Sequence, residues 1–558
     1  MRKKWNEERC HALSLKWKLS PLLIKLLLNR EVEEECFSSY FSPSFDNLHE
    51  PFCMKGMEEA VGRILLSILR KEKVLIWGDF DVDGVTATTL LLKFMHDLKS
   101  PAYYYIPHRE SEGYGLNKDG IRKAFTKNIK LIITCDCGTS SVDEIKLARS
   151  LGMEVVVTDH HQVEEPPPAD FILINPHNSG CTYPFKELSG VGVAFKLCQA
   201  IAQRTNFPRE KLKSYLDLVA IGTLADVVPL TGENRTFVKL GMDNLPSSTT
   251  SSGLRALIKV AGLSGRAIEE KEIGYILSPR LNACGRLSLA KTAVKLLSTD
   301  SMKEALLLAH KLNRENSRRQ SLEKKMCQEA EKIISKKLKY VLIVYNKDWH
   351  PGVVGLVASY LREKYNRPAL AFSIDEDIAR GSARSISRFS VFEALEKCSY
   401  LITSFGGHKM AAGLTLPLAN LEKLEEKLNS IAEDLLCPED FVPCKFFDAE
   451  LNLSSLNKEL VEELKILSPF GPGNPKPVFL AREVKVASWQ NINKGKKFII
   501  TDSTGEKEFE ALSFNFFNEE EEKSIFSQKP VDILYFPRLN IWRQKQTIQL
   551  DIKDIKEV

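Results

Sequence analysis

Residues 74–84 read VLIWGDFDVDG: a short apolar run, a glycine, and then three aspartates at every second position. A similar order returns at 131–136, LIITCD, and at 155–161, VVVTDHH. Each apolar run has the length of a strand and is rich in β-branched residues, and amphipathic stretches such as 87–98 and 142–151 separate the runs. Strands that alternate with helices are typical of βαβ units, so the sequence predicts a parallel α/β sheet.

Acidic residues and histidines follow the ends of these predicted strands. In parallel sheets, functional groups gather beyond the carboxyl ends of the strands. Like charges held together there repel one another unless a multivalent cation neutralises them. If the first strand continues past Gly78, alternation points its three carboxylates the same way. The residues at these positions are Asp79, Asp81, Asp83, Asp136, Asp159, His160 and His161.

Each motif also has an ordinary explanation. The first could be a solvated acidic turn, although an EF-hand loop is disfavoured because its twelfth position is Leu90. Cys135 and Cys137 are predicted to be small buried residues on the face opposite Asp136. The histidine pair suits Mn, Fe or Zn better than Mg, but could belong to a polar loop.

A fourth acidic position, Asp226, lies inside the apolar stretch 224–229. A buried carboxylate needs a partner, often a metal, although a helix cap is the alternative for this residue alone. Together, the acids and imidazoles predict a two-metal site. Such sites activate water and stabilise developing charge in phosphoryl transfer, so we expect metal-assisted hydrolysis of a phosphoester or phosphoanhydride.

The chain of 558 residues is long enough for several domains. Residues 303–337 predict one long connecting helix, and a second α/β unit follows from 340. Short alternating strands near the C-terminus predict a small β-barrel. The expected fold is therefore α/β and multidomain. The expected divisions are an N-terminal segment packing on the catalytic domain (1–60), the catalytic domain (61–302), the connector (303–337), a substrate-binding domain (338–436) and the barrel (444–558).

Composition narrows the class of protein. Hydrophobic residues make up 43% and charged residues 27%, which is typical of a globular protein. No apolar stretch approaches the ~18 residues of a membrane span, and we identify no secretory signal. The 12 scattered cysteines predict free thiols in a reducing compartment, the cytoplasm. A net charge of +5 is compatible with nucleic acid but does not establish it.

The four motifs resemble those of the DHH phosphoesterase superfamily. Further segments resemble its bacterial exonucleases specific for single-stranded DNA, and the resemblance covers essentially the whole chain. The superfamily motifs are GDFDVDG at 78–84, CDCGTS at 135–140, DHH at 159–161 and GTLADVV at 222–228. The further segments are 183–197, SPRLNACGRL at 278–287, FGGHKMAAG at 405–413 and PFGPGNP at 469–475.

The resemblance implies a DHH catalytic domain, a linking helix, a DHHA1 domain and an OB-fold. It implies degradation of single-stranded DNA from the 5′ end to mononucleotides with two Mn²⁺ or Mg²⁺ ions. His161 would contact the scissile phosphate, with Asp136 and Asp81 also catalytic. Which of Asp79 and Asp81 ligates stays open, because many superfamily members begin this motif with a histidine. One ion would be held by Asp79, Asp81 and Asp136, and the other by Asp83, Asp136, His160 and Asp226.

The resemblance also implies a substrate groove. Arg109, Ser382 and Arg384 would form a 5′-phosphate pocket, and Arg280 would lie on the strand path. Each arginine alone could equally form a surface ion pair. We expect the 405–408 segment to precede a helix whose N-terminus could hold an anion. Asn282, Gly406, Gly407 and His408 complete the expected substrate contacts.

The C-terminal tail carries aromatic and basic residues suited to stacking on single strands, although most aromatics of a small barrel belong to its core. Partners implied by the family are single-stranded DNA, a single-strand-binding protein and a helicase, in repair and recombination, with the protein a monomer. The alternatives are a hydrolase of short oligonucleotides or cyclic dinucleotides and a non-catalytic DNA-binding scaffold. The tail aromatics are Trp489, Phe498, Phe514, Phe516 and Trp542.

Overall fold

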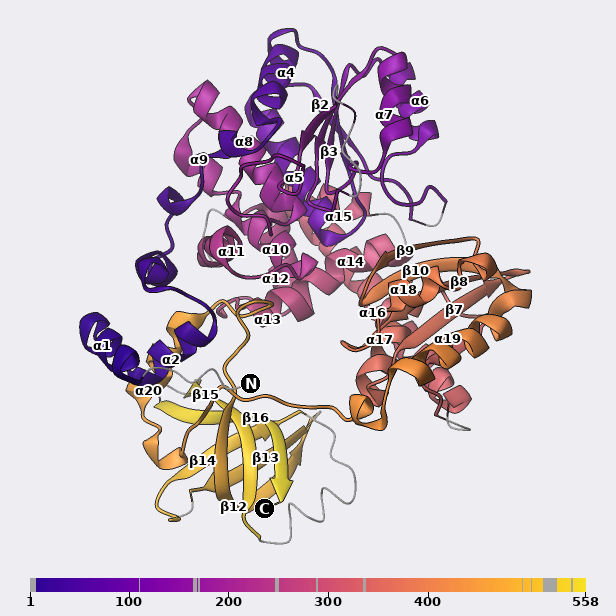
Figure 1. Ribbon diagram of the computed structural model, residues 1–558. Coiled ribbons are helices and arrows are strands. Elements are labelled where there is room, and N and C mark those ends of the chain that lie inside the picture. The colour runs from indigo at the N-terminus through magenta and orange to yellow at the C-terminus, as the bar shows by residue number, and fades with distance from the viewer. Residues whose placement is uncertain are drawn as a thin grey trace.

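In the part of the chain that it describes, the computed structural model contains three sheets, one in each of three units (Figure 1). Within the described residues, no helix combines the length and apolarity that a bilayer crossing needs. The described residues are 7–109, 111–163, 168, 171–245, 250–287, 290–334, 338–493, 495–502, 504–514, 529–542 and 545–557.

The catalytic unit is built on a parallel five-stranded sheet of order β2-β1-β3-β4-β5. Gly78 at the end of β1 pairs with Cys135, and Cys135 pairs with Thr158. The residues that follow these three strands therefore leave the sheet at the same edge. The strands are β1 (Val74–Gly78), β2 (Ala102–Tyr105), β3 (Leu131–Cys135), β4 (Glu154–Thr158) and β5 (Ile172–Ile174).

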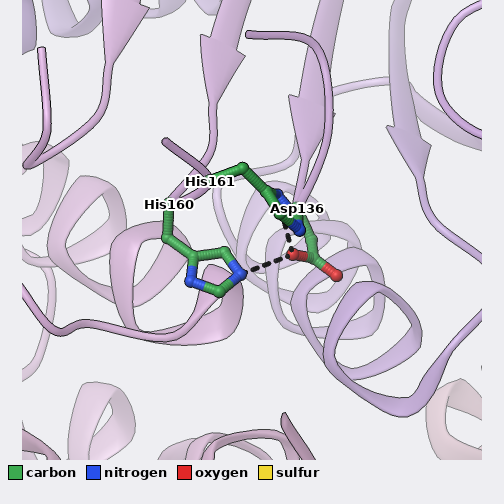
Figure 2. A group of neighbouring side chains, drawn as sticks. All are labelled: Asp136, His160 and His161. Atoms are coloured by element: carbon green, nitrogen blue, oxygen red, sulfur yellow. Dashed lines mark ion pairs between the residues drawn. The ribbon is translucent and has the colours of Figure 1, made fainter. Parts of the chain in front are cut away.

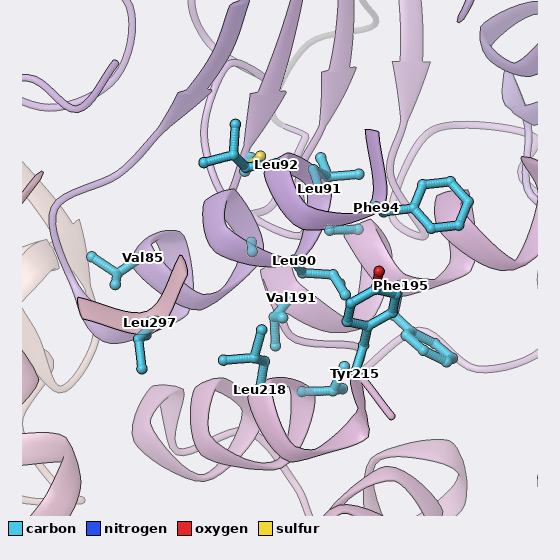
Figure 3. Close-up of a cluster of buried hydrophobic side chains, with 14 of the residues drawn as sticks. Val85, Leu90, Leu91, Leu92, Phe94, Val191, Phe195, Tyr215, Leu218 and Leu297 are labelled. Carbon is cyan, nitrogen blue, oxygen red and sulfur yellow. The ribbon is translucent and has the colours of Figure 1, made fainter. Parts of the chain in front are cut away.

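Helices α5 (Val82–Asp97), α8 (Gly190–Thr205) and α10 (Leu216–Asp226) form the main core of this unit. Figure 3 shows Leu90 and Phe94 of α5 in one buried cluster with Phe195 of α8, and the ring centres of Phe94 and Tyr215 are 6.4 Å apart. Burying each such side chain stabilises the fold by roughly 1.5–3 kcal/mol, so the helices that carry the site are firmly held. The surrounding helices are α4 (Met57–Leu69), α6 (Lys118–Thr126), α7 (Val142–Ser150), α9 (Arg209–Lys213), α11 (Gly232–Asn244), α12 (Ser252–Val260), α13 (Glu270–Glu272), α14 (Ser278–Leu287) and α15 (Lys291–Ser298).

The long helix α16 (Met302–Ile334) confirms the expected connector. Its first half contributes Ala305 and Leu312 to the catalytic core, and its second half contributes Met326 and Ala330 to a cluster with the DHHA1-like sheet. That sheet has the order β6-β7-β8-β10-β9 and is mixed, since β6 and β7 are parallel and the rest antiparallel. Its elements are β6 (Leu342–Asn346), α17 (Val354–Tyr365), β7 (Ala369–Asp375), β8 (Ile378–Arg384), α18 (Val391–Glu396), β9 (Ser404–His408), β10 (Ala411–Pro417) and α19 (Leu421–Leu435).

The C-terminal unit is the expected barrel, which the pairing of β12 with β15 closes. Strand β11 adds to β12 at its rim. Phe498 is fully buried in the barrel core, whereas Phe516 and the side chain of Trp542 lie outside the described residues. The elements are β11 (Ala449–Glu450), α20 (Lys458–Leu464), β12 (Phe479–Ile492), β13 (Gly495–Thr501), β14 (Glu508–Ser513), β15 (Val531–Trp542) and β16 (Lys545–Glu557).

The N-terminal helices α1 (Glu7–Trp17), α2 (Pro21–Asn29) and α3 (Phe37–Phe41) pack on the barrel (Figure 1). Their apolar side chains form one hydrophobic cluster with barrel residues. This corrects the expectation that all of 1–60 packs on the catalytic domain, because the apolar side chains of this segment join the catalytic core only from Phe45 onward. The apolar stripe of a helix does not by itself specify which domain will cover it.

Candidate metal centre and substrate site

The three aspartates of the first motif converge through a strand, a turn and a helix. Strand β1 ends at Gly78, so the condition under which strand alternation would align the three carboxylates is not met. Asp79 lies in the turn, and Asp81 is the N-cap of α5, where its Oδ1 accepts a hydrogen bond from Gly84 N at 2.9 Å. Asp83 lies in the first turn of α5, so the helix rather than strand alternation directs it to the sheet edge.

The start of α8 holds Asp83 in place. Its two carboxylate oxygens accept hydrogen bonds from Gly190 N at 2.6 Å and Val191 N at 2.8 Å. A Cβ at position 190 would lie 2.6 Å from the Cβ of Asp136, so only glycine allows α8 to begin this close to the carboxylates. Asp136 itself has φ +60°, a strained value for a residue other than glycine.

His160 lies among the carboxylates. Its Nε2 is 3.1 Å from Asp136 Oδ1, 3.6 Å from Asp226 Oδ2 and 3.9 Å from Asp83 Oδ2. Figure 2 shows both histidines directed toward Asp136. Three groups have ligand atoms within 4.8 Å of one another, and Asp136 belongs to two of them. The groups are Asp79–Asp81–Asp136, Asp83–His160–Asp226 and Asp136–His160–His161.

Four polar atoms of this centre are buried without a hydrogen-bond partner among the described residues: Asp79 Oδ1, Asp136 Oδ1, His160 Nε2 and Asp226 Oδ2. Buried polar atoms are normally paired, because leaving them unpaired is costly. Carboxylate oxygens with one imidazole suit Mn²⁺ or Mg²⁺, whereas zinc often takes thiolate ligands. The residues therefore fit a divalent cation site.

The pKa values of these residues reflect the same burial and crowding of carboxylates. Burial, followed by the charges of neighbouring carboxylates, raises the pKa of Asp79, Asp83 and Asp136 well above the usual range. The pKa of Asp226 is raised to about 7 for the same two reasons. Burial and the charge of His161 lower the pKa of His160 to about 4, so its ring is neutral and can donate a lone pair.

Asp159 orients the second histidine. Its Oδ1 accepts hydrogen bonds from His161 Nδ1 at 2.7 Å and from His160 N at 2.8 Å, and its Oδ2 accepts one from Thr139 N at 2.9 Å. Burial would raise the pKa of Asp159, but these bonds and the charge of His161 hold it below the usual range. Burial lowers the pKa of His161, but the hydrogen bond and charge of Asp159 outweigh burial and raise it to about 8.

Tyr114 also contacts the centre: its hydroxyl donates to Asp136 O at 3.0 Å and lies 3.3 Å from His161 Nδ1. Tyr114 was not among the expected site residues. Asp159 was expected at the end of its strand, but no role was assigned to it, although it begins the DHH motif. The position of Tyr114 depends on a loop that the sequence pattern does not place.

Ser382 and Arg384 lie together as expected. Arg384 Nη1 donates to Ser382 Oγ at 3.0 Å, and both face the start of α17. A Cβ on Gly355 there would lie 3.2 Å from Ser382 Oγ and 3.4 Å from Arg384 Nη2. The first turn of a helix offers unpaired N–H groups, which favour an anion.

Arg384 belongs to a cluster of arginines. Burial, followed by the charges of Arg109, Arg319 and Arg384, lowers the pKa of Arg286 to about 10. Arg319 Nε is buried without a hydrogen-bond partner among the described residues. Positive charges gathered in this way favour a bound anion. Arg286 and Arg319 were not predicted, because one lies in a helix of the catalytic unit and the other in the connector.

Arg109 is the member of this cluster whose charge also acts on the metal centre. Its guanidinium carbon is 5.2 Å from the centre of the Phe80 ring, and its charge acts on both Asp79 and Arg286. The arginine cluster (Arg109, Arg286, Arg319 and Arg384) is therefore adjacent to the acidic centre.

Other expected substrate residues make contacts outside the arginine cluster. Arg280 donates to Asn313 Oδ1 at 3.0 Å and to Ile276 O at 2.6 Å, so it ties α14 to α16. The prediction of a helix after the 405–408 segment is wrong, because β9 forms a hairpin with β10. Gly406, Gly407 and His408 are exposed on this hairpin, and Gly407 has φ +145°.

Asn282 lines a cleft of about 960 Å³ between the catalytic unit and the barrel. Leu224 and Ala225, which precede Asp226, line the same cleft. Tyr275 and Phe514 face it from the two units and are 84% and 58% exposed. The cleft therefore leads from the acidic centre to the barrel.

Comparisons with known proteins agree with this architecture. The DHH family N-terminal domain matches residues 73–223, the DHHA1 domain matches 338–434, and the RecJ OB domain matches 447–554. The fold and the acidic centre thus define a DHH-family protein that carries an OB-type barrel.

The single-stranded-DNA-specific exonuclease RecJ of Bacillus subtilis is 38% identical over 555 residues, covering 98% of this chain and 70% of the relative. The chain belongs to the RecJ family. Two structures of RecJ from Thermus thermophilus, one in complex with Mn²⁺ and one with Mg²⁺, match with 26% identity and TM-scores of 0.84 and 0.78. Each covers 98% of this chain, and this chain covers 78% and 76% of them.

Proposed function

We propose that the chain is a metal-dependent exonuclease that hydrolyses single-stranded DNA from the 5′ end and releases mononucleotides. The observation that carries this proposal is the set of buried ligand atoms that have no hydrogen-bond partner in the described part of the chain, beside a cluster of arginines. A carboxylate centre suits phosphodiester hydrolysis, and the arginines supply recognition of a terminal phosphate.

Two divalent ions, bound there, would lower the pKa of a water and neutralise charge that develops on the phosphate. Asp79, Asp81 and Asp136 would hold one ion. Asp136 would be shared, with Asp83, His160 and Asp226 completing the other set. Asp79 has a buried oxygen without a hydrogen-bond partner among the residues that the structure describes, whereas Asp81 already caps α5 with Oδ1. Asp79 therefore has the stronger geometric support as a ligand.

His161 would stabilise the scissile phosphate. Its side chain is half-exposed, and the hydrogen bond to Asp159 fixes the ring and favours its protonated form. A protonated imidazole held by a buried carboxylate can donate a hydrogen bond to a phosphate oxygen or a proton to a leaving oxygen.

The arginine cluster supports the 5′ polarity. A terminal phosphate monoester carries more charge than an internal diester, so closely placed guanidinium groups favour the strand end. Arg109 and Arg384 with Ser382 would bind this phosphate, and Arg286 and Arg319 would add to the positive potential. Because Arg109 also acts on Asp79, the bound end would lie beside the acidic centre.

The remaining strand would follow the cleft toward the barrel. Exposed aromatic residues there can stack on bases of any sequence. Asn282 lines this cleft, and Arg280 supports the helix that carries it. His408, Gly406 and Gly407 would contact the backbone from the hairpin.

Full-length protein with single strands labelled at either end tests the proposal. We expect 5′-terminal mononucleotides as the first products with Mn²⁺ or Mg²⁺ and none with EDTA. Release from the 3′ end, or activity without metal, would refute it. A hydrolase of short oligonucleotides, the second candidate, would degrade dinucleotides faster than long strands.

Partners and compartment remain proposals drawn from the family. A single-strand-binding protein and a helicase would supply single strands during repair and recombination. The described cysteines are free, which suits the reducing cytoplasm.

A further inference from the structure

Asp226 is followed by an unusual turn. It is the last residue of α10, and the next residue, Val227, has φ +65°. A β-branched residue rarely adopts this conformation, which persists only where the surroundings hold it. The loop 227–231 then joins α10 to α11. Contacts that hold this loop therefore also fix the end of α10 and the position of the Asp226 carboxylate.

A segment that leads into the barrel packs on this loop. We call residues 466–475 the junction segment. Leu230 N donates a hydrogen bond to Pro472 O at 2.7 Å. A Cβ on Gly473 would lie 3.2 Å from both Pro229 Cβ and Thr231 Cγ2, so the two backbones are in close contact.

Asn474 organises the junction segment. It is 2% exposed, and its Nδ2 donates to Leu467 O and Pro469 O, both at 2.7 Å. Its Oδ1 accepts from Arg30 Nε at 3.0 Å and from Tyr40 OH at 3.2 Å. The amide nitrogen therefore holds the junction segment in its folded shape, and the carbonyl oxygen connects that segment with the N-terminal helices.

Arg235 of α11 completes the connection on the catalytic side. Its Nη1 donates to Leu467 O at 3.0 Å and its Nη2 to Ile466 O at 2.9 Å. The guanidinium carbon also lies 3.7 Å from the centre of the Tyr40 ring. The loop after Asp226 is thus enclosed by α11 and by a segment whose shape depends on Asn474.

We propose that Asn474 is a positioning residue for Asp226: by shaping the junction segment, it holds the loop 227–231 and so keeps the Asp226 carboxylate within reach of His160 and Asp83. The proposal rests on the metal centre of the proposed function. It adds to the residues that shape that centre Asn474, which lies in the segment before strand β12 of the barrel. Residues outside the ligand set that orient ligands typically change metal affinity by about 10- to 100-fold.

The test is a titration of the metal-free full chain with Mn²⁺, followed by calorimetry, for the parent and two variants. Asn474→Ala removes the four hydrogen bonds. Gly473→Ala adds a methyl group against Pro229 and Thr231 and strains the backbone at φ +71°, while all the hydrogen-bonding groups of the Asn474 side chain remain. We expect each variant to weaken one of two Mn²⁺ binding events by about 10-fold or more and to leave the other within about 2-fold.

Asn429→Ala is the matched control, because Asn429 also ties backbone groups together, at Val341 and Glu425, but in the DHHA1 domain. It should titrate like the parent. A folded Asn474→Ala variant with the parent's isotherm would overturn the proposal; if that variant does not fold, the Gly473→Ala isotherm decides in the same way. A parent that binds no pair of Mn²⁺ ions would instead refute the metal centre itself, and the inference with it.

Discussion

Asp159 Oδ1 lies 2.7 Å from His161 Nδ1, so the first and last residues of the DHH motif pair a buried carboxylate with a half-exposed imidazole at the end of β4. The carboxylate fixes the direction of the ring and leaves Nε2 as the atom that can meet the substrate. Asp159 therefore acts through His161 rather than on the phosphate.

Replacing Asp159 with Asn should slow catalysis more than it weakens substrate binding. The amide keeps the size of the side chain but loses the negative charge that orients the His161 ring and favours its protonated form. We therefore expect kcat to fall by about 10- to 100-fold with little change in KM. Steady-state rates on a 5′-phosphorylated single strand measure this. Asp119→Asn, at an exposed residue paired with Arg122, serves as the control. An unchanged kcat would contradict the positioning role.

Asp136→Asn should abolish nuclease activity and raise the melting temperature of the metal-free protein. The variant loses a carboxylate that two groups of candidate ligands contain, and it removes one of several buried like charges. Activity assays and thermal unfolding in EDTA measure the two effects. Asp143→Asn, in the exposed first turn of α7, should change neither. Retained degradation of labelled strands would be incompatible with the ligand assignment.

Arg384→Gln should reduce the preference for a 5′-phosphate over a 5′-hydroxyl. Hydrogen bonds to charged groups contribute about 1.5–3 kcal/mol, so the ratio of kcat/KM for the two strands should fall by about 10-fold or more. The control is Arg388→Gln, at an exposed arginine near Asp440. If the parent degrades both strands equally, the arginine cluster does not recognise the terminal phosphate.

Tyr275→Ala should weaken binding of long strands but not hydrolysis of dinucleotides. Stacking of a base on an aromatic side chain is worth about 1–3 kcal/mol, which corresponds to a loss of affinity of about 5-fold or more. Fluorescence anisotropy with strands of increasing length, in EDTA, measures this. Tyr400→Ala removes an equally exposed ring from the DHHA1 domain and should have no effect. Equal losses for long and short strands would argue against the cleft as the strand path.

The buried carboxyl of Asp217 should make the stability of the protein depend on pH in a way that does not involve the metal centre. This carboxyl is 4% exposed, and burial raises its pKa to about 7. Because the folded state holds the proton more tightly than the unfolded state, Asp217 makes folding less favourable as the pH rises from about 4 to about 7. Asp217→Asn removes this dependence.

The stability of the Asn variant relative to the parent should therefore increase by up to about 1.4 kcal/mol per pH unit across that window and then level off. Urea unfolding in EDTA at several pH values measures the difference. A difference that does not change between pH 4 and pH 7 would show that the carboxyl titrates normally.

The sequence alone determined the strands of the catalytic sheet, the connector helix and most of the acidic centre. These features depend on local patterns: β-branched runs predict strands, and parallel strands bring their ends to one edge. Asp136 and His160 follow such strands directly, so their meeting could be predicted.

Only the tertiary structure decided the rest. Asp81 and Asp83 reach the centre through the start of α5, and α1–α3 join the barrel, because helix caps and apolar stripes do not specify their partners over long distances in sequence. The arginine cluster and the contact of Asn474 with the N-terminal helices likewise bring together residues from separate units. Such contacts depend on how the units pack, which a local pattern of residues does not encode.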